Sequence, residues 1–113
     1  MRAATFRKIA LSLPEAEERE TWGEATFRVR SKIFAMLDGE GKRASIKASK
    51  EEQAALLASE PATFFYPSYV GVHGWVGVVV RTVDADELRE LLTEAWRMTA
   101  PKRLVAAFDD GGS

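Results

Sequence analysis

Basic side chains are concentrated in one stretch of the chain and recur there at alternate positions. Residues 28–50 carry seven basic and two acidic residues, a net charge of +5. In the segment ATFRVR (25–30) the two arginines alternate with Phe27 and Val29, so an extended strand would turn both guanidinium groups to one side. Cations on a common face bind phosphate groups without reading a base sequence. The sequence therefore predicts a phosphate-binding face made of Arg28, Arg30, Lys32, Lys42, Arg43 and Lys47, extended by Lys102 and Arg103.

The overall charge balance bears on how that basic stretch is interpreted. The chain has 16 basic and 17 acidic residues, a net charge of −1, and residues 15–24 carry five acids against one arginine. A strongly basic nucleic-acid-binding protein would have a different total. The alternative interpretation is therefore solvated strand and loop surface. No helix presents a set of base-reading side chains, so binding to double-stranded DNA is expected to show weak sequence specificity.

A second candidate site is the aromatic segment between residues 66 and 75, which contains Tyr66, Tyr69, His73 and Trp75. An exposed Tyr69 or Trp75 ring can stack on a base or line a ligand pocket, and packing in the core is the competing interpretation. An imidazole such as that of His73 can act as a general base, but no nucleophile motif accompanies it. We expect His73 to hydrogen-bond its own loop at the sheet edge. The segment supports an alternative function, the binding of a protein or a small ligand.

Several chemistries lack the residues that they need. The chain has no cysteine and one histidine, which excludes disulfides, thiolate zinc sites, iron–sulfur clusters and a multi-histidine metal site within one chain. Glycines at 71, 74 and 77 match neither the dinucleotide-binding fingerprint nor the phosphate loop. We therefore predict a protein without enzymatic activity, cofactor or metal.

Signals along the chain predict an α+β domain. Helices are expected before Pro14, from the capping box Ser49–Glu52 and from Asp84, with a short last helix from Pro101. Strands are expected at 25–30, 32–37, 43–48, near Phe64 and at 74–81. Because strands come in groups, we expect the order α-β-β-β-α-β-β-α, an antiparallel sheet and helices packed on one face.

The chain is expected to form a single domain over residues 1–108, with a flexible tail at 109–113. It shows no signal-peptide pattern and no apolar run of about 20 residues, so we expect a cytoplasmic protein that does not span a membrane.

Three stretches resemble the MmcQ/YjbR family of small bacterial proteins, many of which are labelled DNA-binding. They are RVRSKIFA (28–35), YPSYVGVHGWV (66–76) and APKRL (100–104), and the second is the most specific. The resemblance covers roughly residues 6–105. It implies a compact fold like that of secretion chaperones and a winged DNA-binding surface.

Overall fold

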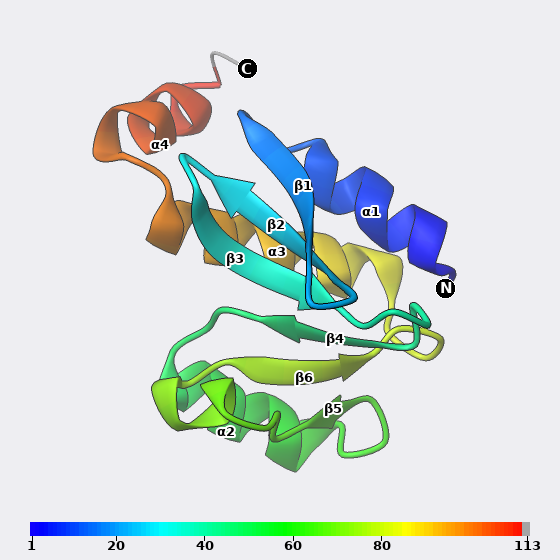
Figure 1. Ribbon diagram of the computed structural model, residues 1–113. Coiled ribbons are helices and arrows are strands. Elements are labelled where there is room, and N and C mark those ends of the chain that lie inside the picture. Colours follow the sequence, from blue (N-terminus) through cyan, green and yellow to red (C-terminus); the bar gives the residue numbers. More distant parts are fainter. Residues whose placement is uncertain (112–113) are drawn as a thin grey trace.

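The computed structural model describes residues 1–111 and arranges them as an antiparallel sheet backed by helices (Figure 1). The helices are α1 (Ala3–Leu11), α2 (Lys50–Ser59), α3 (Ala85–Thr99) and α4 (Lys102–Asp109), with a 3₁₀ helix η1 (Val70–His73). The strands are β1 (Ala16–Thr21), β2 (Glu24–Val29), β3 (Lys32–Leu37), β4 (Arg43–Ile46), β5 (Phe64–Phe65) and β6 (Val76–Val79). They lie in the order β1-β2-β3-β4-β6-β5, and each neighbouring pair is antiparallel. This confirms the predicted α+β class.

Alternation along the strands separates a buried face from an open one. Phe27, Ala35 and Ile46 share a row on the buried face, which α1 and α3 cover from behind the sheet in Figure 1. The opposite face, turned to the viewer, is covered by no α-helix within residues 1–111. We call it the open face, and its central row consists of Arg19, Thr26, Met36, Ser45, Gly77 and Phe65.

An apolar stripe of α3 forms the centre of the core. Leu88, Leu92, Ala95 and Trp96 are each fully buried, as spacing at helical period requires for residues on one face. Asp84 caps the helix by accepting from the backbone amides of Asp86 and Glu87. No helix within the described residues has the length and apolar composition to cross a bilayer.

The structure departs from the predictions near both ends of the chain. A fourth strand, β1, precedes the predicted three; its sequence AEERET shows no apolar alternation because it is a charged, largely exposed edge strand. At the other end, the flexible tail expected from residue 109 does not begin there. Asp109 lies in α4, where its carboxylate is paired with the Arg97 guanidinium. Residues 112 and 113 lie outside the described residues.

Two hairpins turn through two residues with positive φ, the geometry whose twist matches the flanking strands. Trp22 (54°) and Gly23 (81°) join β1 to β2, and Arg30 (51°) and Ser31 (69°) join β2 to β3. The turn moves Arg30 off the strand, so the expectation that Arg28 and Arg30 lie side by side on one strand face is wrong.

A carboxyl group near the start of α3 is expected to make stability depend on pH. Partial burial, a hydrogen bond with Glu60 and the negative charges of Glu60, Asp84 and Glu90 raise the pKa of Glu87 from 4.5 to about 7. The native state therefore holds a proton that the unfolded chain loses between these pH values, and the free energy of unfolding falls as pH rises from 4.5 to 7.

Glu87→Gln is expected to flatten this decline and to raise the free energy of unfolding at pH 8. Because solvent screens a carboxyl group that is only partly buried, we expect a gain of no more than about 1 kcal/mol. Urea titrations of both proteins across this pH range measure it. Glu20→Gln on β1 is the control, and a Glu87→Gln protein that keeps the wild-type pH dependence would contradict the assignment.

Candidate nucleic-acid interface

A cavity at one end of the sheet gathers cations from three separate parts of the chain. It has a volume of ≈ 520 Å³. We call it the cationic end pocket, and its lining residues are Met1, Arg2, Ala3, Glu40, Gly41, Lys42, Arg43, Val79 and Arg81. Figure 1 shows why these segments meet: the N-terminus, the turn between β3 and β4, and the segment after β6 all lie at the right-hand end of the sheet. Four basic side chains thus surround one cavity that also contains a single carboxylate.

Local backbone contacts hold the pocket together. The Asp38 carboxylate accepts hydrogen bonds from the backbone amides of Lys42 (2.9 Å) and Arg43 (3.2 Å), which fixes the turn that presents both side chains. Gly41 lies at φ 71°, and a Cβ there would stand 2.6 Å from the Cβ of Ala3. The N-terminal nitrogen of Met1 donates to the Arg81 carbonyl at 2.8 Å, so the first residues of the chain are tied to the segment after β6.

The cations of the pocket are electrostatically available. Ion pairs within residues 1–111 involve Arg7, Arg19, Arg30 and Arg97. None involves Arg2, Lys42, Arg43 or Arg81, and all four are exposed. A bound anion such as a phosphate would therefore meet positive charge that no ion pair neutralises.

The predicted phosphate-binding face, by contrast, is not one surface. The Arg28 guanidinium is half-buried on the open face and donates to Thr26 Oγ1 (3.1 Å), Thr21 Oγ1 (3.3 Å) and the Ser31 carbonyl (3.3 Å). Glu17 stands opposite Arg28 in the β1–β2 register. Arg28 is thus held by the sheet beside a carboxylate.

Arg30 is neutralised by a neighbour. Its guanidinium donates to both carboxylate oxygens of Glu15, at 2.5 and 3.2 Å. The hydrogen bond with Arg30 and its positive charge hold the pKa of Glu15 below its usual value, and the same pairing raises the pKa of Arg30. Arg30 therefore offers little net charge to a phosphate.

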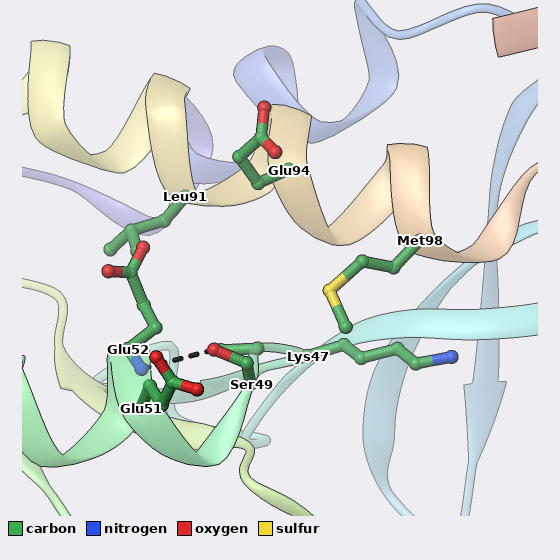
Figure 2. Close-up of a pocket in the computed structure, with 8 residues that line it drawn as sticks. Lys47, Ser49, Glu51, Glu52, Leu91, Glu94 and Met98 are labelled. Atoms are coloured by element: carbon green, nitrogen blue, oxygen red, sulfur yellow. Dashed lines mark hydrogen bonds between the residues drawn. The ribbon is translucent and has the colours of Figure 1, made fainter.

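The remaining predicted cations lie away from the cationic end pocket. Lys32 is exposed at the start of β3, and Lys102 and Arg103 lie on α4. Lys47 lines a different cavity, of ≈ 550 Å³, between the start of α2 and α3, together with Glu51, Glu52 and Glu94. Figure 2 shows the Lys47 side chain running away from Glu51 and Glu52, which face the cavity. Of the eight predicted contacts, only Lys42 and Arg43 come together with other cations around one cavity.

A third cavity, of ≈ 500 Å³, lies on the open face next to the cationic end pocket. We call it the aromatic groove; it is lined by Glu24, Met36, Asp38, Arg43, Ala44, Ser45, Phe65, Pro67, Ser68, Tyr69 and Val70. Of the predicted loop residues, Tyr69 lines it, whereas Tyr66, His73 and Trp75 do not. Phe65 lines it as well.

The loop that carries Tyr69 is fastened by a residue that sequence analysis missed. The buried Gln53 side chain of α2 donates to the carbonyls of Gly71 (2.9 Å) and Trp75 (2.7 Å). The expectation that His73 hydrogen-bonds this loop is wrong: His73 is exposed, and its side chain makes no hydrogen bond with any residue of the described range 1–111. The only sequence signal for Gln53 was its position as a polar residue at a helical spacing from Leu56 and Leu57.

Curated relatives that match this chain are described as uncharacterised. An uncharacterised protein of Mycobacterium bovis and one of Mycobacterium tuberculosis are each 43% identical to it over 54 residues. The matched segment is 48% of this chain and 42% of the length of each relative. The chain thus spans less than half the length of these mycobacterial proteins.

The fold and the family are better defined. A crystal structure of a Deinococcus radiodurans protein with a DUF419 domain superposes with a TM-score of 0.73 at 25% identity, over 81% of this chain and 73% of that one. The model of the YjbR family matches residues 11–98. That match spans the whole six-stranded sheet, η1, α2 and nearly all of α3, so this chain belongs to the YjbR family.

Proposed function

We propose that this chain is a non-enzymatic DNA-binding module that holds the phosphate backbone in the cationic end pocket. The observation that carries the proposal is the convergence of Arg2, Lys42, Arg43 and Arg81 on one cavity, with none of the four in an ion pair within residues 1–111. The residues come from the N-terminus, the β3–β4 turn, the first position of β4 and the segment after β6, and all four are exposed rather than part of the hydrophobic core.

The chemistry of these groups suits phosphate. Guanidinium groups donate in a fork that matches phosphate oxygens, and a lysine adds a mobile point charge. Contacts of this kind supply affinity and position a duplex but carry no sequence information. The net charge of −1 is compatible with such a site because the acids are concentrated elsewhere, on β1 and the outer surfaces of α2 and α3.

Salt dependence is the direct test. If the four cations neutralise about four phosphates, a plot of log K against log salt for duplex DNA should slope by roughly −3.6. Anisotropy titrations of a labelled duplex at several salt concentrations measure the slope. Lys42→Glu and Arg81→Glu should each weaken binding and reduce the slope by roughly one.

Two variants make the test specific to the pocket. Arg89→Glu makes the same charge change at an exposed position of α3 and should leave affinity nearly unchanged. Arg30→Gln removes a cation that Glu15 already pairs. The proposal fails if duplex binding is independent of salt, if no binding occurs at low salt, or if these two variants weaken it as much as Lys42→Glu.

A second candidate function is the binding of a small ligand, which the aromatic groove favours. Its volume of ≈ 500 Å³ falls in the usual range for small-molecule sites, and it combines two aromatic rings with a few polar groups. A ligand held by the groove alone would bind with an affinity that Arg81→Glu does not change, which separates it from the DNA proposal.

A further inference from the structure

One side chain joins the two cavities. Arg43 lines both the cationic end pocket and the aromatic groove. Because Arg43 is the first residue of β4 and faces the open side of the sheet, its guanidinium lies where the end of the sheet meets the open face. A ligand with an anionic part and a planar part could therefore contact both cavities at once.

The floor of the groove is built for a flat group. The Arg43 guanidinium lies over the Phe65 ring, 5.1 Å from its centroid. The Phe65 ring in turn packs on Gly77, where a Cβ would stand 2.3 Å from the ring. Gly77 thus lets the ring lie close to the sheet, and the ring supports the guanidinium from below. Planar guanidinium groups and aromatic rings are the surfaces on which unpaired bases stack.

The rim of the groove holds an exposed ring on a strained backbone. Tyr69 is 92% exposed, and its φ of 64° and ψ of −62° lie outside the conformations that a side-chain-bearing residue prefers. The flanking hydrogen bonds from Val70 to Ser68 and from Gly71 to Pro67 hold this conformation. Strain of this sort persists where the surrounding structure imposes it, and it concentrates at ligand-binding loops. The Tyr69 ring is therefore kept in solvent beside the groove by a backbone conformation that is energetically unfavourable.

Charge orients a ligand across the two cavities. The groove has two acids, Glu24 and Asp38, and Asp38 is already engaged by two backbone amides. These carboxylates disfavour a phosphate in the groove, whereas the end pocket attracts one. A Glu24 carboxylate can instead accept a hydrogen bond from the amino group of a base such as cytosine.

We propose that the two cavities together bind single-stranded DNA, with a phosphate in the cationic end pocket and a neighbouring unstacked base between Arg43 and Tyr69 in the aromatic groove. This inference rests on the proposed DNA-binding function and adds a substrate preference to it. In a duplex the bases are paired and stacked, so reaching the groove would require unstacking, which costs a few kcal/mol. Single strands are therefore bound more tightly than duplexes of the same length.

The experiment compares three probes of equal length: an oligodeoxycytidine, an abasic oligonucleotide with the same number of phosphates, and a duplex. At one salt concentration the oligodeoxycytidine should bind roughly tenfold or more tightly than the abasic strand, the loss expected for one stacked base. Tyr69→Ala should abolish that difference without weakening abasic binding. Tyr69→Phe keeps the ring and should retain it. Thermal unfolding of each variant shows that the fold is intact.

The outcomes separate this inference from the function on which it rests. If all three probes bind alike and Lys42→Glu still weakens each of them, the base-binding inference fails and the DNA-binding function stands. Equal losses in Tyr69→Ala and Tyr69→Phe would also overturn the inference, because the ring would then play no part. If none of the three probes binds at low salt, both fail.

Discussion

Trp96→Ala is expected to lower the free energy of unfolding by about 3–5 kcal/mol, the largest loss for any single substitution considered for this chain. Trp96 is fully buried on the apolar stripe of α3. Its indole N–H donates to the Pro14 carbonyl at 2.9 Å, and its ring lies 5.0 Å from that of Phe108. One side chain therefore ties the segment between α1 and β1, the central helix and α4 together, and its removal leaves a cavity among all three.

Urea unfolding followed by circular dichroism measures the loss, and thermal unfolding should show a fall in Tm of more than about 10 °C. Trp96→Phe is the informative companion. It keeps most of the apolar volume but cannot donate to Pro14, so its cost should be smaller, about 1–3 kcal/mol. A Trp96→Ala protein as stable as the wild type would show that the three elements pack independently of this ring.

Gln53→Leu is expected to have the second largest effect, and it connects stability to the aromatic groove. The substitution removes both donors to the Gly71 and Trp75 carbonyls, and at least the Gly71 contact is buried. A buried carbonyl without a partner costs about 1–3 kcal/mol, so a total loss of about 2–4 kcal/mol is expected. Ala55→Leu, at an exposed position of the same helix, should stay within about 0.5 kcal/mol of the wild type.

The functional consequence of Gln53→Leu is specific. Without its two hydrogen bonds the loop that carries Tyr69 is no longer fastened to α2, so the preference for an oligodeoxycytidine over an abasic strand should shrink. Duplex binding through Lys42 and Arg81 should keep its salt dependence, since both residues line the cationic end pocket and neither lines the aromatic groove. Protease susceptibility of residues 66–75 gives an independent measure of loop release. Loss of duplex binding at a temperature where the variant is folded would contradict this division of roles.

The parts of the fold that sequence analysis predicted well are those in which local pattern and burial coincide. Leu88, Leu92 and Trp96 repeat at helical spacing, and all three are buried. The predicted helix cap at Ser49 is confirmed by the hydrogen bond from the Glu52 amide to Ser49 Oγ, 3.1 Å. The strand β1 escaped prediction because an edge strand exposed on both faces needs no apolar alternation.

The candidate site was predicted less well, and for a different reason. Arg30 follows Arg28 in an alternating pattern, but a two-residue turn with positive φ ends that alternation and places Arg30 beside Glu15. Alternation predicts which face a strand residue occupies; it does not report where the strand stops. Arg2 and Arg81 were not predicted at all, because no local pattern connects them with each other or with Lys42.

The amino-acid sequence by itself determined the types of most elements, the buried stripe of α3, the antiparallel class, and the positions of Lys42 in a turn and Arg43 at the start of a strand, because each depends on neighbours within a few residues. Only the tertiary structure decided which charges meet. The pairing of β4 with β6 brings Lys42 beside the segment after β6. The hydrogen bond between Met1 and Arg81 joins residues that are 80 positions apart in the sequence. Charges act through space and not along the chain, so a cationic pocket made of residues 2, 42, 43 and 81 becomes visible only once the sheet is assembled.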